Sequence, residues 1–247
     1  MNYEENLNYE FKLLINEGEL NKIKKYYLKY FNNNNLLEET LIKGFNKACK
    51  NGNKNVAEWI LLTRPNIIQS LNIDKIFCYA CKDGLLNMAE WLLRIKPDIN
   101  ISAENEKIFR YTCDNNYLEV AQWLLVIKPD INISALDEYT FRYACIYNNL
   151  RIAQWLLEIK PDINIFADDN AAIEQACDNS HFELALWLLG KMLEKKSDIN
   201  INKKILNKLL HYTCEHEKLN IIEELLEKKP EINELIFIFT CTHIIYS

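Results

Sequence analysis

Apolar residues follow a helical spacing that stops and restarts within a short stretch of the chain. Over residues 141–145, Phe, Ala and Cys side chains stand at i, i+3 and i+4, which places them on one face of a helix. The spacing resumes over residues 150–157, after Asn148 and Asn149, which tolerate the left-handed backbone of a tight helix exit. Pro161 ends the second run because the residue before a proline is pushed out of helical geometry. The pattern predicts a helical hairpin, followed by an extended segment and a short loop.

Three positions of this hairpin recur every 32 residues in five copies. They are Trp59, Trp91, Trp123, Trp155 and Trp187; Ala57, Ala89, Ala121, Ala153 and Ala185; and Cys49, Cys81, Cys113, Cys145 and Cys177. A single hairpin cannot bury both of its apolar faces, so the copies must stack on one another. The sequence therefore predicts an all-α solenoid of stacked helix-turn-helix repeats. We interpret the recurring Trp, Ala and Cys residues as its core.

The repeat pattern weakens toward both ends of the chain. We predict one repeat domain over residues 1–247, made of a capping repeat (1–35), regular repeats (36–200), a divergent repeat (201–233) and a partial repeat (234–247). The Trp position holds Lys25 in the first copy and Glu224 in the divergent one, as expected where one face meets water. A lengthening at residues 190–197 is interpreted as an extended helix end. The apolar partial repeat is expected either to pack on the preceding helix or to form a self-association contact.

The order of these parts resembles the ankyrin repeat family. A copy consists of a loop, a first helix ending in Ala-Cys where the family usually has Ala-Ala, a turn, a second helix ending in Trp-Leu-Leu, and Pro-Asp-Ile-Asn where the family has Gly-Ala-Asp-Val-Asn. Tyr139-Thr-Phe-Arg142 replaces the family's Thr-Pro-Leu-His opening. The Lys-Pro-Asp-Ile-Asn-Ile-Ser variant looks like repeats of giant DNA viruses. The resemblance implies an ankyrin-like solenoid, with tetratricopeptide or another α-solenoid packing as the alternative.

Charge and hydropathy narrow the classes of partner. The formal net charge of −6 argues against nucleic acid, since phosphate binding needs clustered Lys and Arg. The N-terminus carries acidic residues where a secretory signal would carry basic ones, and the most apolar segment, residues 235–242, is too short to span a membrane. We therefore expect a cytoplasmic protein without membrane contact, placed in the host cytoplasm if the chain is viral.

Two groups of residues have the spacing of metal or redox sites. Cys78 and Cys81 form a Cys-x-x-Cys pair, but Cys81 occupies the repeated core position and Cys78 stands where later copies have Arg. His211, Cys214 and His216 are close in sequence, yet no second cluster would complete four ligands. We expect structural roles for both groups, no cofactor, no metal and no catalytic residue. A metal-binding or enzymatic domain is retained as a weaker alternative.

Positions that differ between copies point to a binding surface. By the resemblance to ankyrin repeats, loop tips and outer first-helix positions contact partners, and Tyr and Arg are favoured at binding hot spots. The predicted partner-binding residues are Tyr139, Arg142, Ile146, Tyr147, Arg110, Asn115 and Leu136. The sequence thus predicts a scaffold that binds a host or viral protein through a concave surface of loops and first helices. The recognition arm of a ubiquitin-ligase adaptor is the alternative function.

Overall fold

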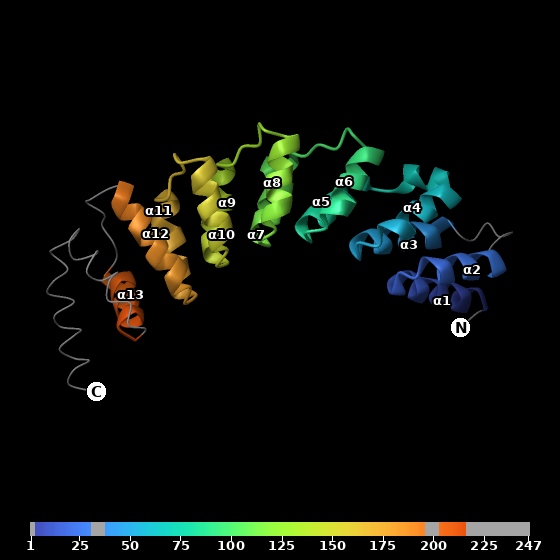
Figure 1. The fold of residues 1–247 in the computed structure, drawn as a ribbon, viewed down its shortest axis with the longest axis horizontal. Helices are drawn as coiled ribbons and strands as arrows, with labels where there is room; N and C mark the ends of the chain where they lie inside the picture. The colour runs from blue at the N-terminus through green and yellow to red at the C-terminus, as the bar shows by residue number, and fades with distance from the viewer. Residues whose placement is uncertain (1–2, 31–37, 196–202, 216–247) are drawn as a thin grey trace. The chain divides into compact units, whose positions relative to one another are not determined.

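The computed structural model describes residues 3–30, 38–195 and 203–215, and every regular element within these ranges is a helix (Figure 1). Contacts within the chain divide it into two compact units, residues 1–131 and residues 132–247. Within each unit, helices follow one another as antiparallel pairs in chain order. The all-α repeat architecture predicted from the sequence is confirmed.

The described residues of the first unit form four helical hairpins. They are α1 (Tyr3–Glu17) with α2 (Leu20–Tyr30), α3 (Glu38–Lys50) with α4 (Lys54–Thr63), α5 (Ile73–Lys82) with α6 (Leu86–Ile95), and α7 (Ala103–Asp114) with α8 (Leu118–Ile127). A 3-10 helix, η2 (Pro65–Ser70), joins the second hairpin to the third. The first helices contact one another in succession, α1 with α3, α3 with α5, and α5 with α7. The repeats of this unit therefore stack through neighbouring first helices.

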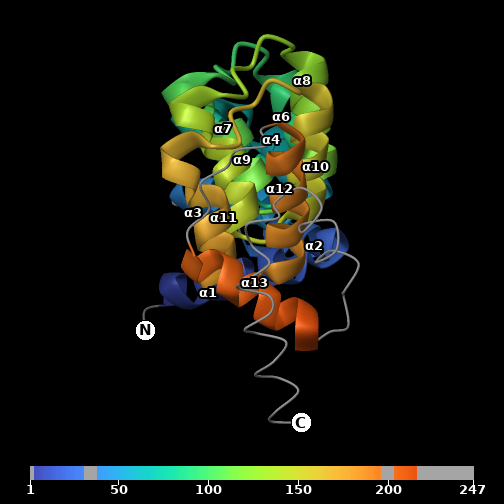
Figure 2. The same cartoon turned by 90° about the vertical axis from the view of Figure 1, so that its left-hand side faces the viewer.

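The second unit continues the pattern with α9 (Ala135–Ile146), α10 (Leu150–Ile159), α11 (Ala167–Asp178), α12 (Phe182–Lys195) and α13 (Lys203–Glu215). Figure 2 shows the first helices α9 and α11 in one layer and the second helices α10 and α12 in another. Helix α12 has 14 residues where α10 has 10, so the lengthening seen in the sequence is indeed an extended helix end. The extension brings Lys195 Nζ within 2.9 Å of the Pro161 carbonyl oxygen, which accepts its hydrogen bond.

The turn inside each hairpin repeats one backbone conformation. Gly52, Gly84, Asn116, Asn148 and Ser180 follow at 32-residue steps and all have φ between 61° and 73°. Each residue lets the first helix end in a left-handed cap, in which a following amide bonds back to a helix carbonyl. In the fifth hairpin, the Asn149 N–H donates to the Ala144 oxygen at 2.8 Å. The tight helix exit predicted at the paired asparagines is confirmed.

The loop before the first helix differs from the sequence-based expectation. In α7, α9 and α11, the first turn contains three consecutive left-handed residues, 104–106, 136–138 and 168–170, with φ between 50° and 69°. The sequence pattern predicts a loop at these positions, and none of the left-handed residues is glycine. The third residue of the turn points inward: Glu138 is buried, and its Oε1 accepts a 3.2 Å hydrogen bond from the Asn164 N–H of the next loop. The turn thus connects successive repeats.

The core consists of the recurring small residues together with one phenylalanine in each of the first helices α1, α3, α5, α7 and α9. Phe11, Phe45, Phe77, Phe109 and Phe141 are fully buried, and the alanines and cysteines that recur at 32-residue intervals are at most 1% exposed. None of these five cysteines takes part in a disulfide, which agrees with their interpretation as small buried apolar residues. The buried residues therefore follow the repeat period, as the stacking model requires.

The tryptophans contribute to packing in a different way from that predicted. Trp91 is buried, whereas the other four Trp side chains are half-buried at the surface of the second helices. Three Trp rings contact an aromatic ring of an earlier repeat: Tyr27 and Trp59 have ring centroids 5.3 Å apart, Phe45 and Trp91 are 6.0 Å apart, and Phe77 and Trp123 are 6.1 Å apart. The Trp position is therefore an inter-repeat contact at the edge of the core.

Candidate functional site

A column of tyrosine rings runs along α9. Tyr139, Tyr143 and Tyr147 are four residues apart, so their side chains lie on the same face of the helix. The rings of Tyr139 and Tyr143 are stacked with centroids 3.9 Å apart, and Tyr147 meets Tyr143 edge-on at 5.7 Å. Tyr147 is 53% exposed. We call these three residues the aromatic strip; it presents a continuous face of rings that are already ordered against one another.

Other predicted contact residues lie on the same helix. Leu136 is 48% exposed in the left-handed turn at the start of α9, and Ile146 is half-buried in its last turn. The structure therefore brings Leu136, Ile146 and the aromatic strip together on a single element. Their role as partner-binding residues stays a prediction.

The guanidinium of Arg142 makes contacts inside its own unit. Its Nε donates to the Asp137 carbonyl oxygen at 2.9 Å, and Nη1 forms an ion pair with Asp168 at the start of α11. The side chain is 13% exposed. Arg142 therefore closes the left-handed turn of α9 and links that turn to the next repeat.

The two predicted residues of the first unit are also engaged within their repeat. Arg110 is buried, and its Nε and Nη2 donate to the carbonyl oxygens of Asn105 and Glu104 at 2.8 and 3.1 Å. Asn115 is exposed at the end of α7, where its Nδ2 donates to the Tyr111 oxygen at 2.8 Å. This position was predicted to bind a partner because it varies between copies. In both copies where it is arginine, the side chain stabilises the backbone turn of its own repeat.

Sequence comparison between copies missed the most regular outward position. Tyr79, Tyr111 and Tyr143 stand 32 residues apart, and a search for variable positions passes over a residue that stays constant in three copies. Tyr79 is nevertheless 46% exposed, while Tyr111 and Tyr143 are half-buried. The spacing of residues 139, 143 and 147 along one helix face was the signal that could have identified Tyr143.

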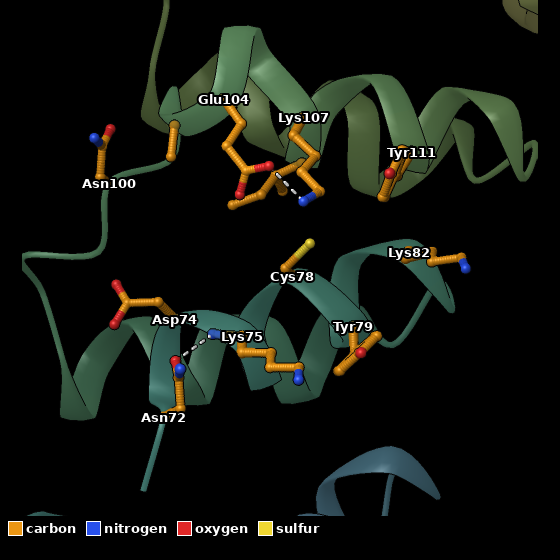
Figure 3. A pocket seen from close by; sticks show the side chains of 12 residues that line it. Asn72, Asp74, Lys75, Cys78, Tyr79, Lys82, Asn100, Glu104, Lys107 and Tyr111 are labelled. Carbon is orange, nitrogen blue, oxygen red and sulfur yellow. Dashed lines mark hydrogen bonds and ion pairs between the residues drawn. The ribbon is translucent and has the colours of Figure 1, made fainter.

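The first unit has a groove between α5 and α7 (Figure 3). It encloses about 600 Å³. Its lining residues are Asn72, Asp74, Lys75, Cys78, Tyr79, Lys82, Asn100, Ala103, Glu104, Lys107, Ile108 and Tyr111. Cys78 points from α5 toward α7 in the middle of the groove, and Glu104 and Lys107 point down from α7 (Figure 3). The groove thus combines three lysines, two carboxylates and two tyrosines.

Both carboxylates of the groove already have cationic partners. Glu104 pairs with Lys107 at 2.6 Å, and this contact raises the pKa of the Lys107 ammonium. Asp74 pairs with Lys96 from the end of α6. Of the groove lysines, Lys75 and Lys82 have no carboxylate within ion-pair distance among the residues that the structure describes. The groove therefore carries an excess of positive charge within an acidic chain.

The thiols of the Cys-x-x-Cys pair lie in different environments. Cys81 is fully buried in the core, and Cys78 is half-buried in the groove. Burial raises the pKa of the Cys78 thiol, and the nearby Lys107 offsets part of that increase. A protonated thiol is a poor nucleophile and a poor metal ligand. Its surroundings favour the structural role predicted for this pair.

The second suspected cluster falls largely outside the described residues. His211 lies on α13, but His216 and the side chain of Cys214 are outside the described part of the chain, as are Glu224 and the partial repeat at 234–247. Within the described ranges, no group of three His, Cys, Asp or Glu side chains is arranged to hold a metal ion. None of the described helices has both the length and the apolar character needed to cross a membrane.

Comparison with known proteins identifies a repeat family. The family model described as "Ankyrin repeats (3 copies)" matches residues 45–137 and 109–204, so the matched region covers more than half of the chain. The matches include the groove between α5 and α7 and the aromatic strip of α9. A comparison with curated proteins finds no match.

Proposed function

Because the chain belongs to the ankyrin repeat family, whose repeats are generally protein-protein interaction modules, we propose that it is a non-enzymatic scaffold that binds a partner protein through its first helices. The observation that carries this proposal is the aromatic strip of α9. Three tyrosines ordered against one another present amphipathic rings on one helix face, and these rings lose little conformational entropy on binding. Tyrosine is also one of the residue types enriched at binding hot spots.

The predicted contact residues divide into two roles in this proposal. Leu136, Tyr139, Ile146 and Tyr147 touch the partner, together with Tyr143, while Asn115 contributes a contact from the first unit. Arg110 and Arg142 act as positioning residues, because their guanidinium groups hold the left-handed turns that precede the first helices. The same scaffold would serve a viral protein acting in a host cytoplasm, as the resemblance to giant-virus repeats suggests.

The ubiquitin-ligase adaptor hypothesis adds a second contact, with a ligase, to the same recognition surface. That contact would require a further motif, and residues 216–247 are outside the described part of the chain. The hypothesis stays a prediction and does not change the surface proposed for partner recognition.

Affinity capture with quantitative mass spectrometry tests the proposal. We expect the combined Tyr139→Ala, Tyr143→Ala and Tyr147→Ala variant to recover its crosslinked partner at least about tenfold less than the parent, since hot-spot residues contribute about 2 kcal/mol or more each. Leu62→Ala is the matched control, because Leu62 is 81% exposed on a second helix, α4. Circular dichroism verifies that both variants keep their helical content. Equal recovery by the parent and the triple variant would overturn the proposal.

A further inference from the structure

We infer that the groove between α5 and α7 binds an extended acidic segment of the partner protein, in which two carboxylates three residues apart meet Lys75 and Lys82. This inference rests on the proposed function and specifies the chemistry of one part of the partner. It concerns the first unit, whereas the aromatic strip belongs to the second.

Charge complementarity is the first argument. The chain has a net charge of −6, yet Lys75 and Lys82 have no carboxylate partner among the described residues. Lys82 is half-buried, and its ammonium has no carboxylate within ion-pair distance among the described residues. The two groove carboxylates, Asp74 and Glu104, are occupied by Lys96 and Lys107. A ligand carboxylate would supply the missing partner for each of the two lysines.

The tyrosine rings hold the lysines in place for such a ligand. Lys75 Nζ lies 5.9 Å from the ring centroid of Tyr79, and Lys82 Nζ lies 5.8 Å from that of Tyr111. Lys107 Nζ approaches the same Tyr111 ring at 5.7 Å. These distances are within the range of cation–π attraction, which restrains the lysine side chains before binding. Less conformational entropy is then lost when a carboxylate is bound.

The spacing of the two lysines sets the spacing of the ligand carboxylates. Residues seven apart in a helix share a face and are separated by about 10.5 Å along the axis, at about 1.5 Å per residue. An extended segment in the polyproline II conformation has three residues per turn and rises about 3.1 Å per residue, so its side chains three residues apart share a face and lie about 9 Å apart along the segment. An extended segment lying along α5 can therefore place one carboxylate at Lys75 and another at Lys82. The motif expected in the partner is Asp or Glu, two intervening residues, and again Asp or Glu.

Cys78 provides the space between the lysines. It stands midway between them on the same face of α5, at the register position that Arg110 and Arg142 occupy in the next two copies. Those arginines donate hydrogen bonds to the left-handed turns at the start of their own helices. Helix α5 has the 3-10 helix η2 before it, so its residue at this position has no such turn to stabilise. A short uncharged side chain at this position leaves the middle of the groove open, as Figure 3 shows. The backbone of a bound segment can then pass over the thiol.

Selection from a displayed library of random short peptides tests this assignment with the full chain. We expect the peptides enriched on the parent to carry acidic pairs three residues apart. The Lys75→Glu, Lys82→Glu double variant should lose these peptides and enrich basic pairs in their place. The control is Lys12→Glu with Lys25→Glu, which changes net charge equally at exposed positions on α1 and α2 and should select the same acidic peptides as the parent.

Fluorescence anisotropy with one enriched acidic peptide gives the quantitative result. The charge-reversed groove variant should bind it roughly tenfold or more weakly, as expected for losing two charge-assisted contacts. Lys75→Arg with Lys82→Arg should retain binding. Enrichment without acidic pairs, or equal affinity for the parent and the charge-reversed variant, would overturn the inference. Stronger competition by a phosphopeptide or by inorganic phosphate than by the unphosphorylated peptide would also overturn the choice of a carboxylate ligand.

The two proposals fail independently of each other. A chain that captures its partner through the aromatic strip but selects no acidic peptide disproves the groove assignment and leaves the scaffold function standing. A chain that selects acidic peptides, but whose strip variant captures its partner unchanged, disproves the role of the strip.

Discussion

The guanidinium Nε of Arg110 lies 2.8 Å from the carbonyl oxygen of Asn105, the middle residue of a left-handed turn. Such a backbone costs a non-glycine residue about 1–2 kcal/mol, and here three such residues occur in succession. Arg110 supplies hydrogen-bond donors to two carbonyl oxygens of this turn. Arg142 does the same for the turn at residues 136–138. The charge of each arginine therefore stabilises the entry to a first helix.

We predict that Arg110→Ala lowers the free energy of unfolding by about 2–4 kcal/mol, because two charge-assisted hydrogen bonds from a buried guanidinium to turn carbonyls are lost. Arg110→Lys should lose part of this amount, since one ammonium cannot reproduce the two-pronged geometry. Urea unfolding followed by circular dichroism measures both values. Arg94→Ala is the control, because Arg94 is exposed at the end of α6 and should change stability by less than about 0.5 kcal/mol. A loss no larger than that of the control would show that Arg110 does not hold the turn.

The helices were predictable from the sequence, whereas the left-handed turns were not. Apolar spacing and the 32-residue period depend only on which side chains must be buried, and they gave the hairpins and the core position of Phe141. A left-handed turn of non-glycine residues contradicts local preferences, so it appears only where tertiary contacts hold it. The inward-pointing Glu138 supplies one such contact and Arg142 another. Neither side chain carries a local signal of that role.

Phe109 and Trp123 should differ in their contributions to stability. Phe109 is fully buried, so Phe109→Ala should lower the free energy of unfolding by about 3–5 kcal/mol through an unfilled core. Trp123 is half-buried, with its ring tilted against that of Phe77, so Trp123→Ala should cost less than Phe109→Ala. Denaturant titration of the two variants under identical conditions gives the comparison. A larger loss for Trp123→Ala would mean that the Trp position is the true core of the repeat.

Gly84 should not accept asparagine, although asparagine occupies the same turn position in two other copies. A side chain at Gly84 would place its Cβ 2.2 Å from the ring of Tyr117, which packs over this turn. We expect Gly84→Asn to lower the free energy of unfolding by about 1–3 kcal/mol through overpacking. Adding Tyr117→Ala should restore part of the loss, whereas Asn116→Gly should be nearly neutral because both residues accept φ near 63°. If the Tyr117→Ala change restores nothing, the crowding explanation is wrong.

Only part of the candidate site could be predicted from the sequence, as Tyr143 and Lys82 illustrate. Comparison between copies detects positions that change, and it identified the helix that carries the aromatic strip. Tyr143 was missed because tyrosine recurs at this position in three copies. Its ring nevertheless contacts both other rings of the aromatic strip. The significance of Lys82 depends on which carboxylates are already paired, and pairing is visible only in three dimensions.

Stability should fall in alkaline solution because of the buried thiols. Burial raises the pKa of Cys49 from its usual 9.0 to about 12. Above pH 9 the unfolded chain therefore releases a proton that the folded chain retains, and the free energy of unfolding decreases by about 1.4 kcal/mol per pH unit for such a thiol. The full stabilisation is present below the unfolded pKa and is lost as pH rises toward the folded one. Cys49→Ala should accordingly approach the parent in stability as pH increases.

Urea titrations with a reductant, from about pH 8 to about pH 10, measure this convergence. Cys49→Ala should be less stable than the parent at the lower pH, because the sulfur fills a fully packed position, and the difference should shrink as the unfolded thiol ionises. Cys78→Ala is the control. Because Cys78 is only half-buried, the difference in stability between this variant and the parent should change less with pH. A stability difference for Cys49→Ala that is independent of pH would show that the thiol ionises as readily in the folded chain as in the unfolded one.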